Sequence, residues 1–473
     1  MNHLIESPVE CDSYRELTAR DHRESRRVPD PMLQRLGLGH LAALDADFLG
    51  YTSDLARRFG DRVFYRVGLV PTYQFTHPEQ IQEVLVTKSK SFRKTDRLRR
   101  VLGRVLGNSL LLNEGESWSR QRALLQPIFN PQRLFDYANP IVRRADELAA
   151  RGVGREVNIA TEMSRLTLLT TAEAVFGVDL SDVAEQFVAE VATLQESTYP
   201  DFTVRSNKLG ELIGPQRSKV SQSIHFLRGV VDAIVDGSVG RSRHDSDGCA
   251  GKLGRLANSA TRKMTRQQAR DEITIVLAGG AGTTATALSW ATYLLAKHSD
   301  AQQLVSDEVD RVLSGRLPSG DDCRSFEFTQ MVLNESMRLF PPAYTTSRQA
   351  ICSVEIGGCQ LTAGSQVHLL PYITHRDARW FDEPHEFRPE RFAASAKHKI
   401  PRFAFIPFGA GPRACIGGGL AMMTGVLVLA TILRRCGLEL ASGQGEPALD
   451  PKISLHPKGG IRLRLTPRKC SKL

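Results

Sequence analysis

The segment Phe408-Gly409-Ala410-Gly411-Pro412-Arg413-Ala414-Cys415-Ile416-Gly417 places one cysteine in a loop rich in glycine and proline. An apolar helix is predicted directly after it, from Gly418 to Arg435. The free N–H groups and the positive dipole end of a helix N-terminus lower the pKa of a nearby thiol and favour the thiolate, which is the form that binds metal. Gly411 and Gly417 let the backbone approach a flat group closely. We therefore interpret Cys415 as a metal ligand rather than a structural cysteine in a glycine turn.

These residues resemble the cysteine loop of the cytochrome P-450 family, whose pattern F-x-x-G-x-R-x-C-x-G is matched at all five specified positions. The resemblance implies a haem-thiolate monooxygenase with haem b as cofactor and Cys415 as the axial ligand to its iron. Phe408, Arg413 and Gly417 then belong to the cofactor site. It also implies a mainly α fold with small β-sheets, an α+β class, with a large helical domain and a small β-rich domain.

Two motifs upstream resemble the family's structural signatures. Glu335-Ser336-Met337-Arg338 is similar to its E-x-x-R helix, and Pro389-Glu390-Arg391-Phe392 is similar to its meander. The resemblance implies that Arg391 joins Glu335 and Arg338 in a triad that locks the Cys415 loop. Apolar neighbours of the Glu335–Arg338 pair favour a buried pair over an exposed one. Removing one partner of a buried pair costs about 3–5 kcal/mol.

A third motif resembles the helix that grips a haem propionate. Trp118 and Arg122 stand at i, i+4 spacing, which places an indole N–H and a guanidinium on one helix face, and both are donors suited to a carboxylate. Arg348 and Arg413 match the other propionate-binding positions of the family. Each of these arginines alone would more often be solvated; together with the cysteine loop they indicate a cofactor site.

The chain has no charged residue from Ile273 to Ala296, a span long enough to cross a bilayer. Thr265-x-x-Gln268 stands upstream and is a capping-box pattern, and the rest of the chain is polar. We expect a buried core helix that ends at Lys297. The alternative is a single-pass membrane protein.

The middle of this helix, Gly279-Gly280-Ala281-Gly282-Thr283-Thr284, resembles the family's A/G-G-x-D/E-T-T motif but lacks its acid. The resemblance gives Thr283 and Thr284 catalytic positions, with Thr283 as the alcohol that hydrogen-bonds bound dioxygen. Three glycines in a helix cost about 1 kcal/mol each, which is reasonable if the helix bulges beside the iron. With Gly282 in place of the acid, protons arrive by another route, the substrate assists, turnover is slow and leaky, or oxidation is peroxide-driven. The alternative function is a haem-thiolate protein that binds ligands without turnover.

The resemblance also implies a substrate pocket and redox partners. The tentative lining of the pocket is Leu277, Ala343, Tyr344 and Thr345. The run Ala343-Tyr344-Thr345-Thr346 is more polar than a purely hydrocarbon pocket needs, which hints at an oxygenated substrate. We expect a hydrophobic or partly oxygenated small molecule, such as a terpenoid or a fatty-acid-like compound, and dioxygen as co-substrate. Electrons from NAD(P)H are expected through a separate ferredoxin or flavodoxin and its reductase. The basic residues expected to surround the Cys415 side are Arg120, Arg133, Arg434 and Arg435.

The bulk composition is that of a globular chain, with 473 residues, 41% hydrophobic residues and a net charge of +10. The arginines are not clustered with aromatic residues, which argues against a nucleic-acid partner. The eight cysteines include no C-x-x-C pair, so no zinc or redox motif is predicted. The first thirty residues contain no apolar run, which argues against a signal peptide or membrane anchor. We expect a cytoplasmic monomer with a flexible tail at 1–32, a haem domain at 33–473 and a polar surface loop at about 237–263.

Apolar periodicity predicts mostly helices. The predicted helices are Met32–Phe59, Pro78–Thr87, Tyr137–Arg151, Ile159–Phe176, Val183–Leu194 and Ser218–Val235. The predicted strands are a hairpin of Val63–Val67 and Thr72–Thr76 around Pro71, followed by Cys352–Ile356, Ser365–Leu370 and Ile461–Leu465.

Overall fold

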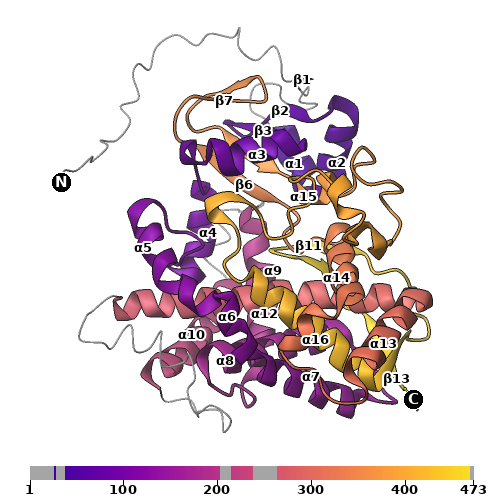
Figure 1. The fold of residues 1–473 in the computed structure, drawn as a ribbon. Helices are drawn as coiled ribbons and strands as arrows, with labels where there is room; N and C mark the ends of the chain where they lie inside the picture. Colours follow the sequence, from indigo (N-terminus) through magenta and orange to yellow (C-terminus); the bar gives the residue numbers. More distant parts are fainter. Residues whose placement is uncertain (1–25, 28–37, 203–214, 238–263, 469–473) are drawn as a thin grey trace, which may run out of the picture.

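The computed structural model describes residues 26–27, 38–202, 215–237 and 264–468. Most of these residues are helical, and the strands form small sheets, which confirms the expected mainly α fold. The helices fill one side of the molecule, and the largest sheet lies at the other side with the N-terminal helices (Figure 1). Residues 238–263 of the predicted polar loop at about 237–263, and nearly all of the predicted tail, lie outside the described residues.

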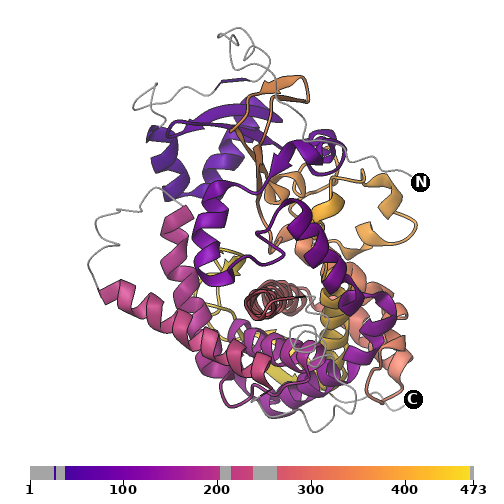
Figure 2. The same cartoon turned by 90° about the vertical axis from the view of Figure 1, so that its left-hand side faces the viewer.

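One long helix organises the helical part. Helix α12 runs from Arg266 to Lys297 and begins with the predicted capping box, in which Thr265 Oγ1 accepts from Gln268 N and Gln268 Oε1 accepts from Thr265 N. It crosses the whole molecule in Figure 1, and Figure 2 looks along its axis, with other helices around it. The helices that pack against it include α8 (Ile159–Phe176), α10 (Pro215–Asp236), α14 (Glu327–Leu339) and α16 (Gly418–Arg435).

Two helices of the described chain, α12 and α16, are long and apolar enough to cross a membrane by length and composition alone. Both pack against other helices of this protein. Residues Ala285 to Leu295 of α12 are almost all buried, and so are Met423 to Leu433 of α16. A helix that is apolar on every side must bury its whole surface in protein or in lipid. Here other helices of the protein bury much of the surface of α12 and of α16. This packing supports the predicted core helix.

The largest sheet has six strands in the order β1-β2-β3-β9-β6-β4. Their bounds are β1 Arg26–Arg27, β2 Arg62–Val67, β3 Val70–Phe75, β9 Gln366–Leu369, β6 Thr346–Ala350 and β4 Phe92–Arg93. A second sheet has three strands in the order β10 (Cys436–Leu440), β13 (Arg462–Pro467) and β5 (Glu156–Asn158). Two further sheets have two strands each: β11 (Leu449–Pro451) pairs with β12 (Leu455–Pro457), and β7 (Val354–Ile356) pairs with β8 (Cys359–Leu361).

Two predicted element boundaries are wrong. The helix predicted over Met32–Phe59 is two helices where it is described, α1 (Leu38–Ala46) and α2 (Phe48–Phe59), because the Asp47 side chain accepts from Gly50 N and caps α2. The β2–β3 hairpin turns at Gly68, whose φ is +61°, and not at Pro71. A glycine adopts that backbone conformation without strain, and Pro71 pairs within β3 opposite Arg66.

The remaining helices are α3 (Pro78–Gln82), which continues into a π-helical turn at Glu83–Thr87, α4 (Asp96–Leu106), α5 (Gly115–Leu125), α6 (Pro131–Leu134), α7 (Ala138–Gly152), α9 (Ala184–Phe202), α13 (Ser299–Leu313) and α15 (Pro371–Thr374). Of these helices, α3, α7 and α9 lie where periodicity predicts them, and the others were not predicted from periodicity. Arg26 and Arg27, within the predicted tail, pair parallel with β2.

Candidate functional site

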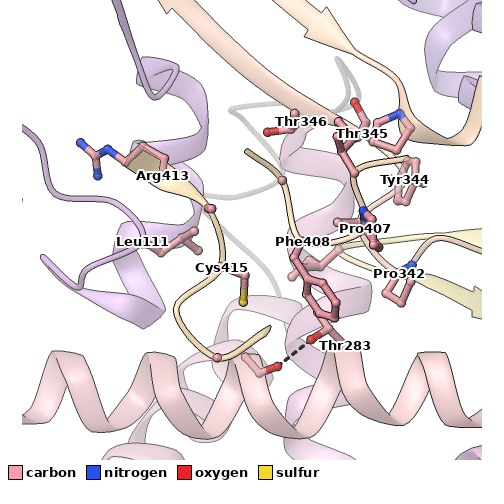
Figure 3. Close-up of a pocket in the computed structure, with 18 of the residues that line it drawn as sticks. Leu111, Thr283, Pro342, Tyr344, Thr345, Thr346, Pro407, Phe408, Arg413 and Cys415 are labelled. Carbon is pink, nitrogen blue, oxygen red and sulfur yellow. Dashed lines mark hydrogen bonds between the residues drawn. The ribbon is translucent and has the colours of Figure 1, made fainter. Parts of the chain in front are cut away.

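Cys415 ends the glycine-rich loop and directly precedes α16. The loop is closed by the Cys415 backbone N–H, which donates to the Phe408 carbonyl at 2.9 Å. The thiol points across a cavity toward the middle of α12, with the Phe408 ring beside it (Figure 3). The cavity has a volume of about 650 Å³ and extends from this loop to the large sheet and helix α1.

Gly411 has a different role from the one predicted. Its φ is +68°, and a Cβ at this position would lie 1.9 Å from the Leu85 carbonyl oxygen of the π-helical turn. The absent side chain therefore lets the loop pack against protein rather than against a flat cofactor. Gly417 lines the cavity, and its Cβ would meet only the Phe129 ring at 3.7 Å.

The Cys415 thiol is less acidic than the sequence predicts. Burial raises the pKa of this thiol, and the Gly417 N–H and the Arg122 charge lower it only in part. Desolvation therefore outweighs the helix terminus in the protein alone. Coordination to a metal ion deprotonates a thiol outright, so such an ion would itself supply the missing stabilisation of the thiolate.

The structure brings Glu335, Arg338 and Arg391 into contact. Glu335 and Arg338 are fully buried, and two Arg338 nitrogens donate to the Glu335 carboxylate at 2.7 and 2.8 Å. Arg391 Nε donates to Glu335 at 3.2 Å. Arg338 also donates to three backbone carbonyls, those of His375, Pro384 and Glu386, so the charged group ties the meander to α14.

His375 links this triad to the cysteine loop, a role that sequence reasoning missed. Its carbonyl accepts from Arg338, and its Nε2 accepts from Ile406 N at 3.0 Å, two residues before Phe408. Burial, with the nearby Arg376 and Arg338 charges, lowers the pKa of His375 to about 3. The ring is therefore neutral, which leaves Nε2 able to accept.

Basic side chains gather at one end of the cavity. Arg122 donates to the Ala414 carbonyl at 2.8 Å. Arg413 stacks over the Trp118 ring at 4.0 Å and pairs with the Glu114 carboxylate. Arg348 donates to Thr346 Oγ1 and to the Ser347 carbonyl, each at 3.0 Å.

Lys94 completes this basic group, and no sequence motif distinguishes it from the basic residues around it. Burial lowers the pKa of Lys94 well below its usual value, and the charges of Arg348 and Arg413 lower it further. Burial also lowers the pKa of Arg348 to about 10. Within the described part of the chain, Glu114 is the carboxylate in this group. Three guanidinium cations against one carboxylate leave a charge excess that two haem propionates would neutralise, so the residues fit haem.

The middle of α12 lies opposite Cys415. Thr283 Oγ1 donates to the Gly279 carbonyl at 2.7 Å, and the Thr283 side chain is exposed to the cavity (Figure 3). Thr284 is buried and also lines the cavity. The helix is α-helical throughout, without the predicted bulge. Gly280 instead allows close packing, because a Cβ there would lie 2.6 Å from Thr171 Oγ1 on α8, whereas a Cβ on Gly282 would meet nothing within 4 Å.

Three of the four predicted substrate residues, Ala343, Tyr344 and Thr345, line the cavity. The Thr345 hydroxyl is buried and has no hydrogen-bond partner among the described residues. Leu277 does not line the cavity. It is fully buried in the core with Leu168 and Phe176 of α8, because its position on α12 faces away from the opening that Ile275 and Val276 reach.

The expected basic surface around Cys415 is wrong for Arg434 and Arg435. Both stand at the C-terminal end of α16, about 27 Å along an 18-residue helix from its start beside Cys415. They pair with Asp146 of α7. Arg120 on α5 is exposed and pairs with Glu116 at 3.7 Å.

Comparisons with known proteins agree with these observations. The family model described as "Cytochrome P-450" matches residues 29–463. Cyclooctatin synthase from Streptomyces melanosporofaciens is 32% identical over 382 residues, 80% of this chain and 82% of the relative. Cyclooctat-9-en-7-ol 5-monooxygenase from the same organism is 30% identical over 86% of this chain and 88% of the relative. Pentalenene oxygenase from Streptomyces avermitilis is 26% identical over 91% of this chain and 95% of the relative.

Proposed function

The chain belongs to the cytochrome P-450 family and is a monooxygenase, and we propose that it inserts one oxygen atom from dioxygen into a cyclic terpenoid. The observation that carries the proposal is the placement of Cys415 across one cavity from Thr283 (Figure 3). The names of the three relatives support a terpenoid substrate, since each relative is named for such a compound.

Haem b is the cofactor that we propose for this cavity, and when bound it supplies dioxygen binding and oxygen-atom transfer. Cys415 would ligate its iron, and this side chain is held in place by the closed loop and, through His375, by the triad. Trp118, Arg122, Arg348 and Arg413 would hold its carboxylates together with Lys94. Phe408 and Gly417 line the side of the sulfur.

The chain's own groups position the substrate and protons. Ala343, Tyr344 and Thr345 form the wall nearest the sheet, and Leu102, Leu110 and Leu111 supply an apolar wall beside α12. Thr283 offers a hydroxyl at the centre of the cavity. No carboxylate stands at position 282, so proton transfer at Thr283 depends on water or on the substrate itself.

We propose NAD(P)H as the electron source, with an acidic ferredoxin or flavodoxin and its reductase as separate partners. Arg120 supports this docking by electrostatic steering. We further propose that the protein is a cytoplasmic monomer, which extraction into detergent-free buffer followed by size-exclusion chromatography tests.

The experiment has two stages. The reduced, carbon monoxide-bound protein should show the absorption band of thiolate coordination, Cys415→Ala should lose it, and Cys352→Ala should keep it. The holoenzyme with NAD(P)H, ferredoxin and reductase should then convert a cyclic terpenoid to a product one oxygen atom heavier. A protein without the band overturns the cofactor assignment. A protein with the band but with product only from hydrogen peroxide, or with none, overturns the NAD(P)H-driven reaction.

A further inference from the structure

The cavity is lined by a histidine, His368, that has no role in the proposed haem site. His368 on β9 lines the cavity and pairs in register with Ser347 of β6, which lines it too. Its Nδ1 lies 3.3 Å from the hydroxyl of Tyr65 on β2. The Phe48 ring lies 6.3 Å away and packs edge-on against Tyr344, so aromatic side chains fix the position of the imidazole.

The hydrogen bond from Tyr65 determines which ring nitrogen of His368 carries the proton. Burial raises the pKa of Tyr65, so its hydroxyl keeps its proton. Nδ1 is the partner that the described residues offer this buried hydroxyl, and we therefore assign the tautomer in which Tyr65 donates to Nδ1. The Nε2 atom then carries the N–H group. Among the described residues, Nε2 has no partner. Burial also lowers the pKa of His368 to about 4, so the ring is neutral near pH 7.

We propose that His368 anchors the substrate, with its Nε2–H group donating a hydrogen bond to a hydroxyl or carbonyl oxygen that the terpenoid already carries. The inference rests on the proposed function and names a narrower substrate class for the same cavity. A neutral donor suits a neutral oxygen, whereas a carboxylate is bound better by a cation. The cavity cations Lys94, Arg122, Arg348 and Arg413 lie in the group that fits the haem carboxylates. Lys452 pairs with Asp450 at 3.1 Å, and Arg97 has a partner of its own.

The anchor also places the reaction within a sequence. His368 and Ser347 lie on the sheet, while the oxidising centre lies at the Cys415 loop on another wall of the cavity. The new oxygen atom is therefore added to a carbon away from the existing one. An earlier reaction, a hydroxylation or oxidation of the terpene hydrocarbon, must supply this substrate.

The test compares terpene alcohols with hydrocarbons of the same skeleton. The probes are menthol with p-menthane, cedrol with cedrane, and sclareol with labdane, and the readout is the Kd from the spectral shift of the ferric holoenzyme. For at least one pair, the alcohol should bind more tightly by about 2- to 10-fold, the range of one net hydrogen bond. Palmitic acid is the carboxylate control.

His368→Leu should abolish the preference by weakening binding of the alcohol alone, and His368→Gln, which keeps an N–H donor, should restore part of it. His385→Leu, a substitution of an exposed histidine, should leave it unchanged. The proposal is overturned if no pair shows a preference for the alcohol, or if the His368→Leu variant keeps that preference. It is also overturned if this variant weakens the binding of the hydrocarbon and of palmitic acid as much as the binding of the alcohol. The thiolate band of each variant shows separately whether the proposed haem site is intact.

Discussion

Gly282 is the single residue at which this chain departs most clearly from its family's motif. Its neighbour Gly280 has a packing role against Thr171, but no side chain or backbone lies within 4 Å of a Cβ placed on Gly282. The position therefore has room for a carboxylate. An acid there would stand beside Thr283, the hydroxyl that faces the cavity.

We predict that Gly282→Glu raises the coupling of NAD(P)H consumption to product, because a carboxylate close to Thr283 relays protons better than water alone. General acid–base groups typically contribute about 10²–10⁴-fold to a rate, and a several-fold gain in coupling is a modest part of that range. Product formed per NAD(P)H consumed is the measurement. Unchanged coupling in a variant with an intact thiolate band would show that protons reach the site by a route independent of position 282.

At the scale of elements, the buried triad joins the meander to α14, and His375 carries this link to the cysteine loop. Glu335 accepts from Arg338, Arg391 and the Arg388 backbone. A single carboxylate therefore neutralises two buried or half-buried cations. The loop depends on the charge of Glu335 although that residue does not touch it.

Glu335→Gln should lower the free energy of unfolding by about 3–5 kcal/mol, because it leaves Arg338 buried without a counter-charge. Haem retention should fall with it. Glu116→Gln is the matched control; its side chain is 95% exposed, and the change should stay within about 0.5 kcal/mol. Urea unfolding of both variants measures the difference. Similar stability in the two would mean that the triad is dispensable.

The start of α12 anchors the loop that follows α4. Asp271 accepts from Asn108 N at 2.8 Å and Glu272 accepts from Leu110 N at 3.1 Å, so two adjacent carboxylates fix a segment that lines the cavity. The pKa of Glu272 is raised from 4.5 to about 7, mainly by burial and in part by the Asp271 charge. The hydrogen bond from Leu110 N lowers this pKa but does not offset burial.

This shift gives a stability that depends on pH. Between pH 4.5 and 7 the unfolded chain ionises at Glu272 while the folded chain stays protonated, so this group's contribution to stability falls as pH rises, by up to about 3 kcal/mol. Glu272→Gln should therefore gain stability relative to the parent protein between pH 5 and pH 8. Urea unfolding at the two pH values measures the gain. An equal difference at both would exclude the raised pKa.

At the scale of the whole molecule, α16 separates two basic regions. Its N-terminal end lies beside Cys415, and its C-terminal end carries Arg434 and Arg435 about 27 Å away. We propose that a redox partner approaches the end near the sulfur, where α5 contacts the cysteine loop through Arg122 and carries the exposed Arg120. Arg434 is thus a control of the same charge on the same chain.

Arg120→Glu should slow reduction by an acidic plant-type ferredoxin about 3- to 10-fold at low salt, since charge at the docking face sets the association rate. Arg434→Glu should change it little. The effect should vanish at high ionic strength, where exposed charges are screened. Stopped-flow reduction under carbon monoxide measures the rates. Equal slowing by both substitutions would show that net charge, rather than a docking face, controls the rate.

The sequence by itself determined the features that local chemistry encodes. The Cys415 loop, the α12 capping box and the Glu335–Arg338 spacing each depend on residues close together in the chain. Only the tertiary structure decided which side chains meet across the fold. Leu277 belongs to the core and Val276 to the cavity, Gly411 makes room for Leu85, and the half-buried Lys94 and His368 line the cavity. Burial depends on segments far apart in sequence, and periodicity carries no information about which segment will cover a given face.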